Sequence, residues 1–447
     1  MMRNKGEAGV AFAGISAQKP GETAGNAGGA AAVRAGWFVT FALCLGYATF
    51  AILLNSVGTA ILQSTGYFHV DNRAASTLEA FKDITIAVAS FALASHLPRF
   101  GIRRSMVAAL LIAGLGCIAV PLGDSFWAMR LMFFATGLGF ALMKVAVYSS
   151  VGLLTSSASS HARLLGIIES AFMAAVVSSS WIFAAFIDPT DASSPSWLNT
   201  YWLLAGLCLV AALAAVFVRV DERGLSVKQD DAAATPRAFT AMLALLRLRL
   251  TQVFIGAIFL YVLIEQGVGT WLPTINHRVL GLDGQIAVQA ASAFAMSIAL
   301  GRLVAGLLVT RVGWFPLILG CLAGMAAILL AVPGMVGPDA HALVTSWRDI
   351  PLPALLLPAI GFFMAPIYPT LNSVILSSVP KARQPGLIGL IVVFSALGGT
   401  TGSRIVAELF SAIPDARVLY SLLVPIALLA AGVIVLKRLA EEGVPVD

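Results

Sequence analysis

Residues 251–275 read TQVFIGAIFLYVLIEQGVGTWLPTI, an apolar run with one acidic side chain, Glu265, near its middle. A run of about 20 apolar residues spans the hydrocarbon core of a bilayer as a helix. A charge at that depth costs on the order of 2.5–3.5 kcal/mol, so it is retained where it has a partner or a task. The stretch therefore predicts both a membrane helix and a functional acid.

Apolar runs of this kind fill the rest of the chain. They predict twelve spans, at residues 37–62, 76–97, 105–123, 126–151, 163–187, 197–219, 251–275, 287–310, 315–336, 351–377, 386–412 and 418–436. With 59% hydrophobic and 11% charged residues, the chain is too apolar for a water-soluble domain. We expect an all-α membrane protein with twelve transmembrane helices.

Basic residues concentrate in alternate connections between the runs, for example at Arg99, Arg103, Arg104 and Lys437. This is the positive-inside pattern, and it predicts that both termini are cytoplasmic. The formal net charge of +6 therefore reflects topology in a membrane and does not indicate a nucleic-acid partner. We expect a multi-pass protein of a cell membrane such as the bacterial inner membrane.

One long polar connection divides the twelve runs into six and six. The predicted parts are a disordered cytoplasmic tail (1–35), an N-terminal six-helix bundle (36–220), a cytoplasmic linker (221–250), a C-terminal six-helix bundle (251–437) and a second tail (438–447).

The two predicted bundles share a loop motif. Arg99-Phe100-Gly101 follows the second run, and Arg311-Val312-Gly313 follows the eighth. Two pseudo-symmetric six-helix bundles with a site at the midplane are typical of alternating-access transporters. We assign Arg99, Gly101, Arg311 and Gly313 to gating or structural roles, although a short basic loop can follow any membrane helix.

Lys144 and Glu169 lie at similar depths on neighbouring predicted helices, which predicts an ion pair between them. Such a pair could be a structural clamp. It could also be switched by protons or by an anionic substrate that displaces Glu169 from Lys144.

The second run carries Glu79, Lys82 and Asp83 close together. Burial disfavours a charged carboxylate, so we assign Asp83, together with Glu169 and Glu265, to proton coupling. A local pair of Lys82 with an acid, without any role in transport, is the alternative.

Residues that weaken helices gather in three runs, at Gly267 to Pro273, at Pro358 to Pro369 and at Gly398 to Gly402. Breaks of this kind are tolerated where a cavity or a neighbouring helix satisfies the freed backbone groups. Small residues such as Ser395, Gly398 and Gly402 also permit close helix packing.

Several further side chains are predicted to contact substrate. With Lys144 they are Asn55, Ser56, Tyr261, Gln266, Trp271, Tyr368 and Asn372. Trp271 and Tyr261 could stack on a sugar ring or serve as interior packing. Arg404 and Glu408 are four residues apart, which predicts a pair within one helix.

The sequence carries no nucleotide-binding fingerprint, no metal-ligand spacing and no nucleophile–base constellation. We therefore expect neither an enzyme nor a bound cofactor, and an ion gradient as the energy source.

Four stretches resemble the major facilitator superfamily, and within it most closely the fucose–galactose–glucose:proton symporter family. They are residues 260–273, 300–306, 364–370 and 395–399. The resemblance implies the major facilitator fold and places Arg302 in a gating or structural role. The chain departs from the pattern at Pro98 and Thr310, where an aspartate is typical, and at Ser56 and Lys144, where sugar transporters carry acids.

Together these features predict a monomeric secondary active transporter that carries a small polar solute by proton symport. The resemblance favours a sugar. Lys144 favours an organic anion instead, and proton-driven drug efflux or a non-transporting nutrient sensor are further alternatives.

Overall fold

The computed structural model describes residues 25–94, 101–155, 157–218, 240, 242–336, 343–380, 383–413 and 415–441. Arg99 and most of the predicted linker lie outside these residues. The described chain is almost entirely helical, which confirms the predicted class.

The N-terminal half comprises α1 (Gly25–Asn55), α2 (Val57–Tyr67), α3 (Asn72–Ala94), α5 (Ile102–Gly123), α6 (Phe126–Leu154), α7 (Ala158–Ala184), η1 (Pro195–Leu198) and α8 (Asn199–Val216). The C-terminal half comprises η4 (Leu245–Arg247), α10 (Arg249–Gly269), α11 (Leu272–Arg278), α12 (Gly284–Val312), α13 (Trp314–Met335), η5 (Trp347–Asp349), α14 (Leu352–Met364), α15 (Ile367–Ser378), α16 (Gln384–Ala412), η7 (Ala416–Leu422) and α17 (Leu423–Glu441).

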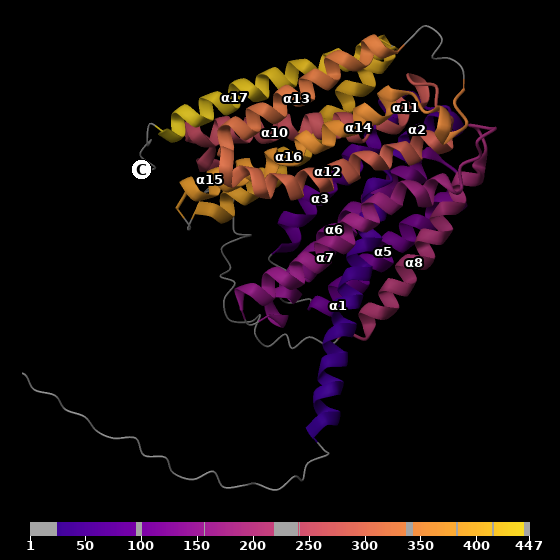
Figure 1. Cartoon of the computed structure of the whole chain (residues 1–447). Helices are drawn as coiled ribbons and strands as arrows, with labels where there is room; N and C mark the ends of the chain where they lie inside the picture. The colour runs from indigo at the N-terminus through magenta and orange to yellow at the C-terminus, as the bar shows by residue number, and fades with distance from the viewer. Residues whose placement is uncertain are drawn as a thin grey trace, which may run out of the picture.

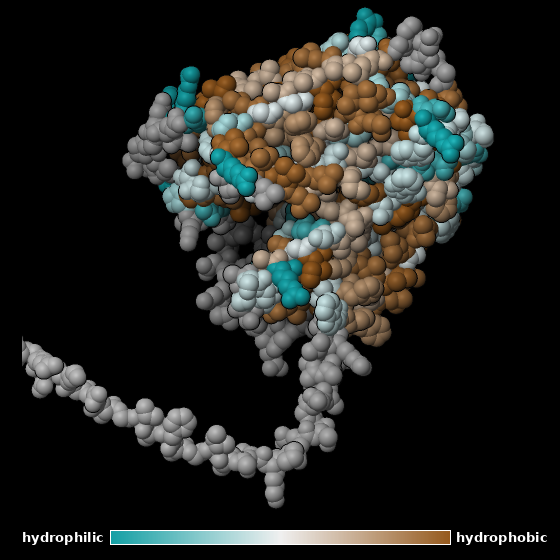
Figure 2. Space-filling model, viewed as in Figure 1, coloured by the Kyte–Doolittle hydropathy of each residue, from teal (hydrophilic) through white to brown (hydrophobic). Residues whose placement is uncertain are grey.

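Among the described residues, 11 helical segments are long and apolar enough to cross a membrane. The helix α3 occupies the place of the second predicted run and completes a set of twelve. It falls outside the 11 because Glu79, Lys82 and Asp83 exceed the charge content of an ordinary span. An apolar surface covers much of the molecule, as lipid contact requires (Figure 2).

Three spans are interrupted. Two of these breaks, at Thr270–Trp271 and at Ala365–Pro366, lie in runs where the sequence predicted them. The third separates α1 from α2 at Ser56 and was not predicted; the Ser56 hydroxyl there donates to the Leu53 carbonyl at 2.7 Å. The predicted break near Gly398 is absent: α16 is one continuous helix from Gln384 to Ala412.

The predicted ends of several parts differ from the structure. The helix α1 begins at Gly25, so residues 25–35 are helical and not a disordered tail. At the other end, α17 reaches Glu441, beyond the predicted boundary at residue 437.

The two halves meet along α3 and α16, α7 and α12, and α2 and α11. We call the end of the bundle where α1 begins and α17 ends the terminal end, and the opposite end the distal end. The halves converge at the distal end, near α2 and α11, and diverge toward the terminal end (Figure 1).

The glycines of α16 permit close packing on α10. A β-carbon at Gly398 would lie 2.5 Å from the backbone oxygen of Phe259, and one at Gly402 would clash with the backbone oxygen of Leu263. The stripe that the sequence indicated is therefore a helix-packing surface.

We expect Gly402→Val to lower the melting temperature of the purified protein. The added side chain has no room against Leu263, and overpacking of this kind typically costs about 1–3 kcal/mol. Gly306→Val on α12 is the matched control, because nothing lies within 4 Å of a β-carbon there. Equal melting temperatures for the two variants would contradict the packing role.

Candidate functional site

Several polar side chains within the predicted membrane spans are exposed. They include Asn55 at the end of α1, Lys144 and Tyr148 on α6, and Arg302 on α12. Lys144 and Arg302 each lie ten residues from the terminal end of their helix, roughly 15 Å deep at 1.5 Å per residue. A recess opens between α7 and α12 toward the terminal end (Figure 2). We call this recess the central hollow.

The predicted pair of Lys144 with Glu169 does not form. Glu169 instead accepts a hydrogen bond from the Tyr148 hydroxyl at 2.9 Å. The Lys144 ammonium lies 6.0 Å from the centre of the Phe140 ring and feels only the longer-range attraction of Glu169. The partner of Glu169 is therefore the neutral hydroxyl of Tyr148, and not the ammonium of Lys144 as predicted.

Aromatic side chains form a cluster next to Lys144. The ring centres of Tyr47 and Phe172 are 4.6 Å apart, and Phe140 lies 5.9 Å from Tyr47 and 6.3 Å from Phe172. Neither Tyr47 nor Tyr148 was among the predicted site residues. Tyr148 could have been found, because Phe140, Lys144 and Tyr148 recur every four residues on one helix face.

The opposite wall belongs to the C-terminal half. The Tyr261 hydroxyl donates to Glu265 at 3.2 Å, and the ring centres of Tyr261 and Tyr368 are 5.5 Å apart. Arg302 attracts Glu265 electrostatically without a direct ion pair, and its guanidinium contacts the sulfur of Met173 on α7 at 3.9 Å. Arg302 therefore reaches across the hollow toward the N-terminal half.

The predicted cluster on α3 forms and is buried. The Lys82 ammonium lies 2.5 Å from a carboxylate oxygen of Glu79 and 3.4 Å from one of Asp83. Thr270, at the break after α10, contacts this cluster: its hydroxyl lies 2.9 Å from Glu79 Oε2 and 3.0 Å from Gln266 Oε1. The two acceptors share one hydroxyl proton.

Two of the predicted substrate contacts, Ser56 and Trp271, are buried in this structure. Ser56 is completely buried and bonds to backbone. Trp271 is also completely buried; its indole N–H donates to Ser403 at 3.1 Å and its ring stacks on Phe410 at 5.7 Å. Both side chains are interior packing, since the breaks beside them turn the chain into the core.

The remaining predicted contacts differ in exposure: Tyr261 is buried and Lys144 is exposed. Gln266, Tyr368 and Asn372 are half-buried, and Asn55 is exposed. The side-chain oxygen of Asn372 has no hydrogen-bond partner among the described residues.

The distal end is closed by polar contacts between the halves. Arg404 and Glu408 form the predicted pair within α16 at 2.8 Å, and Arg73 of α3 joins them, 2.6 Å from Glu408. Arg404 also donates to the Arg73 carbonyl at 2.9 Å. The sequence analysis did not anticipate Arg73, because its partner lies in the other half of the chain.

A second polar contact across the distal end involves Arg278 of α11. It donates to Asn72 at 3.0 Å and to Thr65 at 2.9 Å. Trp181 of α7 donates to Ser292 of α12 at 3.1 Å and stacks on Trp347 at 5.8 Å. These contacts keep the hollow closed on the distal side.

The two loop motifs have matching backbone geometry. Gly101 has φ 84° and Gly313 has φ 83°, a left-handed conformation that glycine adopts without steric cost. Arg311 is exposed beside its glycine. The matched angles support a structural role for both glycines in two related halves.

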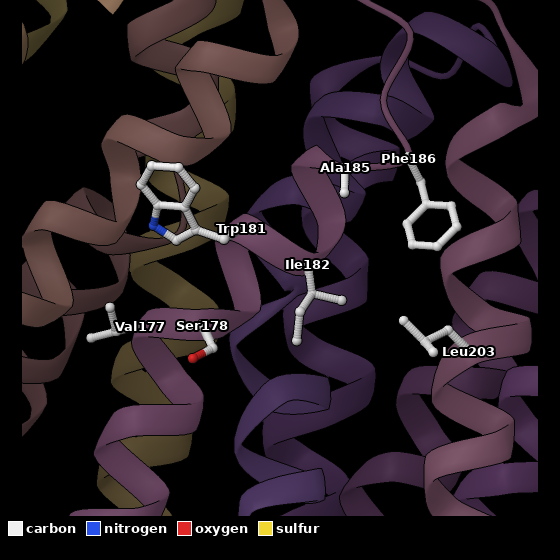
Figure 3. Close-up of a pocket in the computed structure, with 7 residues that line it drawn as sticks. All are labelled: Val177, Ser178, Trp181, Ile182, Ala185, Phe186 and Leu203. Carbon is white, nitrogen blue, oxygen red and sulfur yellow. The ribbon is translucent and has the colours of Figure 1, made fainter.

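A separate cavity of about 450 Å³ lies on the outer face of α7 and α8 (Figure 3). Its lining is apolar apart from Ser178 and includes Trp181, Phe186 and Leu203. It holds no ionisable side chain, so it is not the candidate site. Among the described residues, no group of three or more His, Cys, Asp or Glu could hold a metal ion.

Solved structures share this fold. A variant of the nucleoside transporter NupG superposes with a TM-score of 0.66 at 12% identity, over 91% of this chain and 100% of that one. A D-xylose–proton symporter gives 0.66 at 15% identity, over 90% and 97%. The Escherichia coli fucose:proton symporter FucP gives 0.57 at 16% identity, over 90% and 98%.

Sequence comparisons give the family. An uncharacterised MFS-type transporter of Enterobacter sp. (strain 638) is 27% identical over 261 residues, which are 56% of this chain and 64% of that relative. The match therefore spans less than two thirds of the relative's length. The family model of the Major Facilitator Superfamily matches residues 36–403. This chain is a multi-pass membrane protein and a member of the Major Facilitator Superfamily.

Proposed function

We propose that this transporter carries a small organic anion through the central hollow by alternating access. The observation that supports this is the pair of cations there. Lys144 and Arg302 are exposed, and within the described chain neither has a carboxylate oxygen within 4.0 Å. A cation at this depth persists only with a partner or a task, and a bound anion would be that partner.

The acids of the hollow leave these cations available. Tyr148 donates to Glu169, and Tyr261 donates to Glu265. Because each carboxylate is held by a hydroxyl, an incoming anion does not need to break an ion pair to reach either cation. It competes only with water.

The two cations belong to different halves. Lys144 lies on α6 of the N-terminal half and Arg302 on α12 of the C-terminal half. An anion held between them gains interaction energy when the halves approach. A ligand shifts a conformational equilibrium only by such differential binding, so this placement suits a carrier that closes around its substrate.

The aromatic rings suit an anion that also has an apolar part. Tyr47, Phe140 and Phe172 adjoin Lys144, and Tyr261 and Tyr368 adjoin Glu265. Arginine binds carboxylates and phosphates bidentately. The proposed substrate is therefore a small carboxylate or phosphate with an apolar body.

A neutral sugar is the second candidate. Two of the solved structures with this fold are named as D-xylose and fucose symporters. The half-buried amides of Gln266 and Asn372, beside Tyr368, offer the hydrogen bonds and the ring face that a sugar needs. For either substrate, we propose that transport is coupled to protons. We also propose that the terminal end faces the cytoplasm, so that the hollow opens to the cytoplasm in this structure.

A thermal-shift screen separates the two candidates. We expect benzoate, lactate or a sugar phosphate to raise the melting temperature of the purified protein, whereas xylose and fucose leave it unchanged. Saturation at about 100 times Kd stabilises a protein by about 2.7 kcal/mol. Lys144→Gln and Arg302→Gln each remove a charged partner, so each should weaken anion binding by about 10–100-fold.

Lys437→Gln is the matched control, because Lys437 lies over Phe315 near the end of α17, away from the hollow. If sugars alone raise the melting temperature, the proposed substrate is a sugar and not an organic anion. Anion binding that survives both Lys144→Gln and Arg302→Gln would refute the proposed site.

A second prediction concerns Tyr148. Tyr148→Phe removes the hydroxyl that holds Glu169 and frees the carboxylate to pair with Lys144. We expect anion affinity to fall by about 5–10-fold, a typical size for such coupling. Titration by calorimetry measures it, and the double variant Tyr148→Phe with Glu169→Gln should regain the lost affinity. A double variant as weak as the single one would contradict this competition.

A further inference from the structure

The charged cluster on α3 lies at the interface between the halves and carries an unbalanced charge. The exposed side-chain fractions are 0% for Glu79, 6% for Lys82 and 13% for Asp83. One ammonium serves two carboxylates, so the cluster has a net charge of −1 when all three groups are ionised. A buried unbalanced charge is costly, and one bound proton removes it.

The two carboxylates are held differently. Glu79 has a partner on each carboxylate oxygen: Lys82 on one, and on the other the Thr270 hydroxyl, which Gln266 shares. Asp83 has only the more distant Lys82 contact, and its carboxyl lies close enough to Glu79 for the two acids to interact. Asp83 is also the most exposed of the three. It is therefore the carboxylate that can exchange a proton with water.

Among the described residues, Lys82 is the only cation within 4.0 Å of the Asp83 carboxylate. On α16 it faces Gly399, where a β-carbon would lie 2.8 Å from Asp83 Oδ2. The helix α10 contributes Gln266. Its ionisable groups nearby are Glu265, which is attracted to Lys82, and Tyr261, which donates to Glu265.

The other element packed on this part of α3 is α6. At Gly137 the backbones of α6 and α3 lie close together, since a β-carbon there would lie 2.6 Å from the backbone oxygen of Lys82. The charged residues of α6 are Arg130, which donates to Thr77 at 3.1 Å, and Lys144, which lies two helical turns beyond Gly137. Neither of them pairs with Asp83.

The cluster is connected to the distal closure. Thr270 stands at the break between α10 and α11, and α11 carries Arg278, which bonds to Asn72 and Thr65. A β-carbon at Gly58 of α2 would clash with the Thr270 backbone oxygen, so the halves are in direct contact there. Because Thr270 and Glu79 belong to different halves, a separation of the halves at the distal end would strain or break the contact between them.

We propose that Glu79, Lys82 and Asp83 form the proton-coupling site of this transporter, with Asp83 as the acceptor and Thr270 as the link to the distal closure. A proton from water in the hollow forms the O–H bond at Asp83 and returns to water when the site deprotonates. The neutral cluster remains in the closed interface, and the charged cluster favours separation of α3 from α16. This inference rests on alternating access in the proposed function, but not on the identity of the substrate.

The test needs no substrate. Nitroxide labels at Ser193→Cys and Thr345→Cys, two exposed distal positions in opposite halves, report the distance between the halves by electron paramagnetic resonance. The full chain is measured in lipid nanodiscs at about pH 5.5 and about pH 8.5. We expect the ratio of closed to open molecules to change by about tenfold between these values. A sample without introduced cysteines measures labelling of the four native ones.

Asp83→Asn should abolish this pH response and keep the distribution seen at low pH. Glu79→Gln should also abolish it, because Lys82 and Asp83 then form a balanced pair. Asp83→Glu retains a carboxyl and should retain the response, as should the control Asp349→Asn in an exposed loop.

A pH response that persists in Asp83→Asn, or its absence in the unmodified chain, would overturn the proposal. The two proposals can fail separately. If no anion binds but the pH response follows Asp83, the coupling site stands and the substrate assignment falls. If anions bind at Lys144 and no pH response exists, the reverse holds.

Discussion

A charged side chain at bilayer depth needs a charged partner, a hydrogen-bond donor or water, and the charges described above each have one of these. Glu79, Lys82 and Asp83 are paired with one another at the interface between the halves. Lys144 and Arg302 are exposed and carry no ion pair among the described residues, and Arg302 contacts Met173 of the other half. The division separates charges that hold the halves together from charges that are free to meet a ligand.

The contacts between the halves are distributed unevenly along the bundle. Arg73, Glu408 and Arg404 join α3 to α16 near the distal end, and Arg278 joins α11 to the N-terminal half. At the terminal end the halves diverge (Figure 1). A molecule closed on one side and open on the other is one of the two states that alternating access requires. The distal contacts are polar and partly exposed, so they can break without burying an unpaired charge.

Much of the fold could be predicted from local pattern. Long apolar runs give the helices, and the repeated loop glycines, Gly101 and Gly313, both adopt the left-handed conformation that suits a sharp turn. The breaks near Thr270 and Pro366 follow from glycine and proline. The break at Ser56 escaped prediction because no residue there forbids a helix.

The sequence by itself determined that this is a helical membrane protein with charges at bilayer depth, since apolar length and composition are properties of local stretches. It also identified the α3 cluster, whose members lie within about one helical turn. Only the tertiary structure decided the partners of isolated residues: Glu169 is bonded to Tyr148 instead of Lys144, Trp271 is buried, and Arg73 meets Glu408. The reason is physical. Helices that are far apart in the chain rotate and pack against one another in the folded protein. Their packing decides which way each side chain points and which neighbouring residue it meets.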